Sequence, residues 1–144
     1  MILLVINCGS SSIKYQLLDM KSDEVYDILA KGIVEKIGLE MGCLQHSPVG
    51  KPKVVKELPV PDHKVGMQLV LEALTDKDFG VLKSLDDIEA VGHRIVHGGE
   101  YFSGSALVDE DVLRKIEICC DFAPLHNPAH LLGIRAVQAV LPTV

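Results

Sequence analysis

The first segment that could do chemistry is a serine-rich turn, Asn7-Cys8-Gly9-Ser10-Ser11-Ser12, which is followed by Lys14. Gly9 lets the backbone approach a ligand closely, and consecutive turn N–H groups with serine hydroxyls can hold an anion. Ser12 and Lys14 are two residues apart on an expected strand, so they share one face and can reach the same phosphate. The turn matches neither the P-loop nor the G-x-S-x-G pattern, which disfavours both of those sites. The alternative is a plain hairpin turn with solvated serines.

A second segment, His93-Arg94-Ile95-Val96-His97-Gly98-Gly99, ends an expected strand over residues 88–96. Strand ends in α/β sheets are where ligands bind, and Arg94 could hold a carboxylate or phosphate in a bidentate way. Alternation predicts that His93 and His97 lie on one face of the strand and Arg94 on the other. The alternative is a structural Arg94 paired with an internal Asp, beside histidines that only make hydrogen bonds.

A third segment, residues 123–130, is a loop that enters a helix. Asn127 and Pro128 predict the N-cap and the first position of that helix. His126 then lies just before the cap, beside a positive helix end suited to anions. A metal site built from the histidines is disfavoured, because the chain has neither H-E-x-x-H nor C-x-x-C; the histidines concerned are His93, His97, His126 and His130.

The four cysteines show no disulfide spacing, which predicts reduced thiols and a cytoplasmic protein. A reactive thiol is one interpretation of Cys8 within the expected turn, but no signal in the sequence indicates a lowered pKa for it. Cys119 and Cys120 are expected to pack in the core from an apolar helix.

A single α/β domain is expected to position these segments. An apolar run at 2–6 and an alternating run at 12–19 predict an antiparallel hairpin, with a third extended stretch at 25–37. Two short extended pieces should flank residues 47–52. The other expected elements are a helix at 62–76 capped by Asp62, the strand at 88–96, a helix at 109–120 with an acidic first turn, and a helix from 127 to 141.

Composition excludes several functions. The 144 residues carry 14 Lys+Arg and 20 Asp+Glu, a net charge of −6, so non-specific nucleic-acid binding is not expected. Only 4% of residues are aromatic and Trp is absent, which disfavours base stacking. No apolar run approaches the ~18–20 residues of a membrane span, and the N-terminus lacks a basic leader. We therefore expect neither a nucleic-acid nor a membrane partner.

The three segments together resemble the acetate kinase family of carboxylate kinases. The resemblance rests on residues 5–14, 92–99 and 123–128, in the same order, and it extends over essentially all 144 residues. It implies a ribonuclease-H-like fold of the superfamily that includes actin, sugar kinases and heat-shock ATPases. Such a fold has a mixed sheet that starts with three antiparallel strands and carries helices on its faces. The implied reaction is reversible, Mg²⁺-dependent transfer of phosphate from ATP to acetate, which gives acetyl phosphate and ADP.

The resemblance also implies residue roles. Asn7 resembles the family's magnesium-site Asn, and Arg94 resembles the Arg that binds the acyl carboxylate. His126 resembles a His that contacts the transferring phosphoryl group. The family's phosphate-contacting turn corresponds to Gly9, Ser10, Ser12 and Lys14, of which Lys14 is usually assigned to ATP.

The resemblance further implies that residues 1–144 are the N-terminal domain of a longer enzyme, usually a homodimer. A helix that returns across an α/β sheet is normally followed by a strand, and the sequence stops at Val144, where that strand should begin. The family's catalytic Asp, its adenosine pocket and its C-terminal metal-binding Glu would lie beyond this point, so we expect the segment alone to be inactive. The alternatives are a propionate-preferring kinase of the same family and a non-catalytic module that binds phosphate or a partner.

Overall fold

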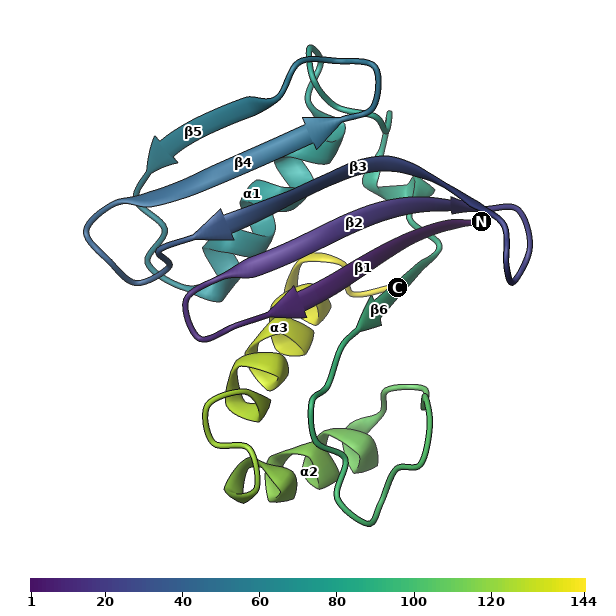
Figure 1. Ribbon diagram of the computed structural model, residues 1–144, viewed down its shortest axis with the longest axis vertical. Helices are drawn as coiled ribbons and strands as arrows, with labels where there is room; N and C mark the ends of the chain where they lie inside the picture. The colour runs from purple at the N-terminus through teal and green to yellow at the C-terminus, as the bar shows by residue number, and fades with distance from the viewer.

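The structure, a computed structural model, describes all residues 1–144 as one mixed sheet with two long helices packed against it (Figure 1). The strands are β1 Ile2–Cys8, β2 Ile13–Met20, β3 Tyr26–Glu35, β4 Gly42–Pro48, β5 Val54–Leu58 and β6 Ala90–His93. The α-helices are α1 His63–Thr75, α2 Glu110–Ile118 and α3 Asn127–Val140, and two short 3₁₀ turns, η1 and η2, cover Leu85–Asp87 and Cys119–Asp121. The expected order of elements is confirmed.

The strand order in the sheet is β5-β4-β3-β2-β1-β6. The predicted hairpin is present, because β1 and β2 pair antiparallel with Asn7 opposite Lys14. β6 pairs parallel with β1, and Ile6 lies opposite His93. The carboxyl ends of β1 and β6 therefore lie side by side at one edge of the sheet, where the turn and the Arg94 segment both begin.

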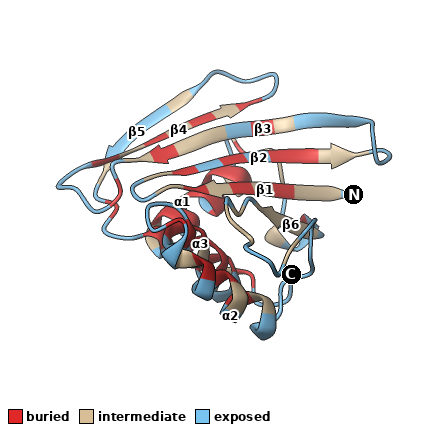
Figure 2. Cartoon of the chain, turned by 60° about the horizontal axis from the view of Figure 1, so that its bottom comes forward, coloured by how far each residue is buried: buried red, intermediate tan, exposed pale blue.

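One hydrophobic core lies between the sheet and the helices α1 and α3. Alternate side chains of β2 are buried, as its sequence pattern predicted. Burial also alternates along β1, although its continuous apolar run indicated a strand covered on both faces. These alternately buried residues of both strands join a cluster of 20 buried residues (Figure 2). α1 begins where predicted, since the Asp62 carboxylate accepts a hydrogen bond from the Val65 N–H at 2.8 Å. Helix α3 covers β1 and β6 beside α1.

A second, smaller core lies beneath the first, around α2. It contains Leu113, Ile116 and Ile134 as its only fully buried members. The first turn of α2 is acidic, as predicted, but the helix begins one residue later than expected: Asp109 is the N-cap and accepts the Val112 N–H at 2.7 Å, and Glu110 and Asp111 follow it. The segment between β6 and α2, residues 94–109, contains neither helix nor strand.

The predicted strand at 88–96 is too long at both ends. β6 comprises only residues 90–93, so His93 and His97 do not alternate along one strand. The physical reason lies in another segment. The Asn127 side chain donates to the His97 C=O at 2.8 Å and accepts the His97 N–H at 3.3 Å. The Asn127 amide therefore forms the hydrogen bonds with the His97 N–H and C=O that a neighbouring strand would form if β6 continued.

The predicted cap of α3 is wrong by one residue. His126 is the N-cap and Asn127 is already helical; the Asn127 side chain is fully buried and makes the bonds to His97 described above. His126 makes no side-chain capping bond. The imidazole of His126 is therefore exposed at the start of the helix and is not engaged in holding the helix end.

Candidate functional site

The serine-rich turn is held in place by backbone contacts. Within it, the Gly9 N–H donates to the Ser12 C=O at 2.9 Å. A side chain on Gly9 would collide with the Ser12 hydroxyl, because a Cβ there would lie 2.7 Å from its Oγ. The Nε2–H of His63, at the start of α1, donates to the Gly9 C=O at 2.7 Å. The exposed side chains of Ser10 and Ser11 thus stand on a fixed backbone.

Lys14 lies beside this turn on the face of the sheet opposite the helices. Its side chain is exposed and forms no ion pair, and Asn7 lies directly opposite it on β1. Both residues line an open hollow of about 410 Å³ together with Lys31 and Lys53, and no carboxylate lines it. The hollow is therefore a basic surface on an acidic protein, as an anion site requires.

The interpretation of Cys8 as a reactive turn thiol is wrong. Cys8 is the last residue of β1 and only 2% exposed, and burial raises its thiol pKa to about 12. The helix α3 packs so closely here that a Cβ on Gly133 would lie in contact with the Cys8 sulfur. A thiol in this position stays protonated and contributes to packing. Cys119 is buried as expected, whereas Cys120 is only partly so.

Arg94 is the first residue after β6. Its backbone N–H still donates to the Ile6 C=O at 3.1 Å, which fixes the Cα beside the end of β1. Its side chain is exposed and takes part in none of the ion pairs of the molecule, which join other residues. The alternative of a structural Arg paired with an internal Asp is therefore wrong. The guanidinium is free to hold an anion in a bidentate way.

Three imidazoles gather near Arg94. The rings of His126 and His130, one helical turn apart on α3, are nearly parallel, with centroids 6.4 Å apart and planes at 19°. Burial, and then the neighbouring His130, lower the pKa of His93 to about 4. Burial, and then His126, also lower the pKa of His130, and Arg94 acts in the same direction. His93 and His130 are therefore uncharged at neutral pH.

His97 has a structural part in this arrangement. Besides its bonds to Asn127, its Nδ1 accepts the Gly99 N–H at 3.0 Å and its ring stacks on Phe122 at 5.3 Å. Gly99 has a φ of +58°, which favours glycine. His97 thus organises the loop between β6 and α2.

The three predicted segments converge on one residue that the prediction did not assign a role. His130 interacts electrostatically with Arg94 and His126, and the backbone of Cys8 also lies beside its ring. The ends of β1 and β6 and the start of α3 thus meet around it. His63 and Asn127 were also missed as residues that hold the site, since neither contact leaves a local signal in the sequence.

The structure contains no group of three or more His, Cys, Asp or Glu side chains that could hold a metal ion. Asn7 provides one amide oxygen at the hollow described above. No helix combines the length and the apolar character that crossing a bilayer requires.

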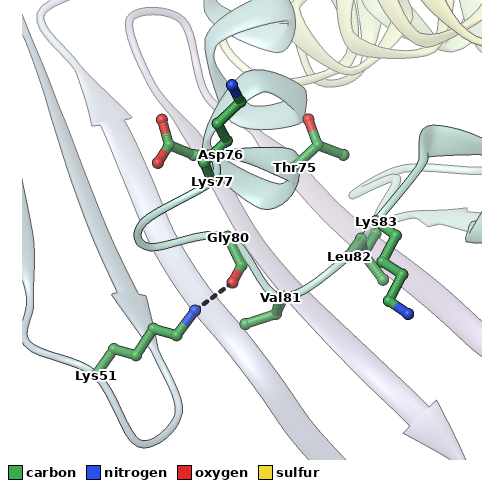
Figure 3. A pocket seen from close by; sticks show the side chains of 8 residues that line it. All are labelled: Lys51, Thr75, Asp76, Lys77, Gly80, Val81, Leu82 and Lys83. Atoms are coloured by element: carbon green, nitrogen blue, oxygen red, sulfur yellow. Dashed lines mark hydrogen bonds between the residues drawn. The ribbon is translucent and has the colours of Figure 1, made fainter.

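A second hollow, of about 540 Å³, lies away from these residues at the C-terminal end of α1 (Figure 3). Lys51 closes one side of it by donating to the Gly80 C=O at 2.8 Å. None of the predicted site residues lines it, and the Lys51 ammonium is already engaged, so the phosphate turn remains the stronger candidate site.

Comparison with known proteins adds independent findings. The sequence model of the acetokinase family matches residues 2–144. The acetate kinase of Caldanaerobacter subterraneus subsp. tengcongensis is 54% identical over 142 residues, which are 99% of this chain and 35% of that protein. The acetate kinase of Clostridium acetobutylicum is 54% identical over 141 residues, 98% of this chain and 34% of that protein. The chain thus spans about a third of the length of these curated relatives.

Solved structures resemble the chain equally well. The acetate kinase of Porphyromonas gingivalis has a TM-score of 0.94 at 45% identity and covers 99% of this chain, which matches 35% of that structure. A propionate kinase of Francisella tularensis subsp. tularensis has a TM-score of 0.87 at 38% identity, with the same coverage. The predicted fold class, a mixed sheet with packed helices like that of the actin-like ATPases, is therefore confirmed.

Proposed function

This chain belongs to the acetokinase family, and on that premise we propose that it is the N-terminal part of an acetate kinase. In the proposed reaction, a carboxylate oxygen of acetate attacks the γ-phosphorus of ATP. The new P–O bond gives acetyl phosphate, and the bond to the bridging oxygen breaks to release ADP. We further propose that the complete protein is a cytoplasmic homodimer.

The observation that carries this proposal is a pair of free cationic side chains near one end of the sheet: Lys14 lies at the start of β2 and Arg94 follows β6, with β1 between the two strands. Lys14 and Arg94 are exposed and unpaired, and the strands β1 and β6 bring the turn and the Arg94 segment to the same edge of the sheet. Phosphoryl transfer depends on positioning and on neutralising charge more than on covalent chemistry. Two free cations and a fixed anion-binding turn match that need.

Each side chain has a distinct proposed task. The turn with Ser10, Ser12 and Lys14 binds phosphate oxygens, and Arg94 orients the acetate carboxylate through two parallel hydrogen bonds. His126, exposed at the start of α3, contacts the phosphoryl group during transfer, where the helix end also favours negative charge.

The residues at the turn fit a magnesium ion that is held mainly by nucleotide phosphates and water, because such an ion needs only one or two protein ligands. Asn7 would supply the amide oxygen, and the ion would neutralise charge on the phosphates. Since the structure has no acidic cluster for a metal, we propose that residues 1–144 do not hold Mg²⁺ tightly without nucleotide.

A chimera tests the function directly. Residues 1–144 would replace the matching third of the Caldanaerobacter acetate kinase, to which they are 54% identical. We expect Mg²⁺-dependent and acetate-dependent ADP formation from the chimera and none from residues 1–144 alone. An inactive but folded chimera, or clear turnover by residues 1–144 alone, would contradict the proposal.

Arg94→Ala in the chimera should impair the use of acetate much more than that of ATP. Charge-assisted hydrogen bonds to a carboxylate contribute about 1.5–3 kcal/mol, so kcat/KM for acetate should fall roughly 10–150-fold. Arg94→Lys should restore only part of this, because an ammonium cannot form two parallel bonds. Arg135→Ala is the matched control, since Arg135 already pairs with Glu110 at the surface. Unchanged acetate kinetics in Arg94→Ala would make Arg94 structural.

A propionate kinase is the second candidate, favoured by the structural relative from Francisella. One methylene in a pocket changes specificity by only about 1–3 kcal/mol. The ratio of kcat/KM for acetate to that for propionate, measured on the chimera, decides between the two.

A further inference from the structure

His130 is the only residue whose buried side-chain nitrogen or oxygen atoms have no hydrogen-bond partner. It is 3% exposed, and neither ring nitrogen has a hydrogen bond of good geometry, although the backbone of Cys8 lies close enough to act on the ring and partly opposes the fall in its pKa. Buried polar groups in native proteins are nearly always paired, so an unpaired imidazole calls for an explanation other than the stability of the fold.

The other buried imidazoles in this chain behave differently. The Tyr15 hydroxyl donates to His46 Nδ1 at 2.7 Å, and His46 Nε2 donates to the Phe79 C=O at 3.2 Å. His63 donates to the Gly9 C=O. These rings hold distant segments together through hydrogen bonds, which His130 does not do.

The His130 ring instead stacks with the ring of His126. The two rings are nearly parallel at 6.4 Å, within the range of offset stacking, and the His130 N–H donates to the His126 C=O at 3.0 Å. Because α3 packs tightly on the end of β1 at Gly133, the His130 ring has a rigid base. His126 itself makes no side-chain capping bond.

We propose that His130 is a positioning residue for the reaction proposed above: its buried ring is the platform that holds the exposed His126 ring toward the phosphoryl group. The platform is uncharged at neutral pH, since burial lowers its pKa. It therefore adds no positive charge beside the cationic Arg94 at the end of β6.

Variants of the chimera described above test this role. His130→Leu removes the aromatic platform, and we expect kcat to fall at least about tenfold with the KM for acetate within about twofold, because a displaced catalytic group lowers kcat first. His130→Phe keeps a flat uncharged ring and should retain kcat within about threefold. A loss in both variants would assign the role to the ring nitrogens and overturn the platform, as would full activity in His130→Leu.

Thermal unfolding of residues 1–144 supplies a readout that does not depend on activity. His130→Leu should leave the Tm unchanged or higher, since no hydrogen bond is lost. His46→Leu should lower the Tm clearly because two partners lose their bonds, and His46→Gln is the milder control. In the chimera, His46→Gln should leave the kcat of the folded protein unchanged. A fall in Tm for His130→Leu equal to that for His46→Leu would make His130 structural and overturn the inference.

The two proposals fail in different ways. A folded wild-type chimera without activity would overturn the acetate kinase function and, with it, the role of His130. An active wild type beside an equally active His130→Leu variant would overturn only the role of His130.

Discussion

Two regions of the molecule differ in how many of their polar side chains have a hydrogen-bond or ion-pair partner. The first region is the sheet with α1, and the second runs from Arg94 to the start of α3. In the first region, the buried polar groups are paired, as His46 is with Tyr15 and Phe79. In the second, Arg94 has no ion pair and His130 no hydrogen bond. A buried polar group without a partner costs stability, so His130 contributes something other than stability, whereas the exposed Arg94 guanidinium stays solvated and available to a ligand.

The apolar side chains show the same contrast. The first region shares a core of 20 buried residues, whereas the core around α2 has three. Phe122 and Leu125, in the loop before α3, are 66% and 77% exposed. The sheet and α1 thus bury a large core, whereas the region around α2 has a small core and leaves large apolar side chains exposed. This fits a chain that spans about a third of its relatives' length.

Core truncations should separate the two regions most strongly. Leu4→Ala opens a cavity in the large core and should lower the free energy of unfolding by about 2–5 kcal/mol. Leu113→Ala should instead raise hydrogen exchange mainly in α2, because its core is small and peripheral. Urea unfolding and amide exchange of the two variants provide the measurements. Equal global losses would show that the molecule has a single cooperative core.

Mild acid should destabilise the protein through the half-buried imidazole of His93. The unfolded chain takes up a proton at His93 near the ordinary pKa of 6.5, but the folded chain does so only near 4. The free energy of unfolding should therefore fall as the pH drops from 6.5 to 4, by at most about 3 kcal/mol for this residue.

His93→Leu should flatten that pH dependence, whereas Lys14→Ala, on the opposite face, should leave it unchanged. Urea unfolding at a series of pH values is the measurement. A slope that is the same in wild type and His93→Leu would count against an uncharged His93.

Removal of a helix cap should produce the smallest difference between the two regions. Asp62→Ala should lower the free energy of unfolding by about 1 kcal/mol, because α1 carries part of the large core. Asp109→Ala removes an equivalent bond from α2 but should mainly increase local fraying of that helix. Global unfolding and amide exchange distinguish these outcomes, and an equal global loss would contradict the separation of the two regions.

Local patterns were sufficient to predict much of the scaffold. The predicted cap Asp62 accepts a hydrogen bond from an N–H three residues further along the chain, and the alternation of Ile13, Lys14 and Tyr15 reflects burial on a single strand. Such signals involve only a few neighbouring residues, so they can be recognised in the sequence without the structure. The motifs of the turn and of the Arg94 segment could be recognised because each is also a short, continuous stretch of sequence.

The errors and omissions lie where distant segments meet. β6 ends early because Asn127, thirty residues further along the chain, binds the His97 backbone. His63 holds a turn fifty-four residues before it. That His130 is buried and unpaired follows only from the packing of α3 on β1. No local pattern encodes these contacts, and together they shape the candidate site.

The most direct test of an anion site at the turn and the Arg94 segment is an NMR titration of residues 1–144 with inorganic phosphate. The account predicts weak, salt-sensitive shifts at Gly9 to Lys14 and around Arg94 and His126, with none around His46, since exposed charges are screened over ~8 Å at physiological ionic strength. Lys14→Ala should remove most of the shifts at the turn and leave the fold intact. No shifts at millimolar phosphate, or shifts centred on His46, would contradict the account.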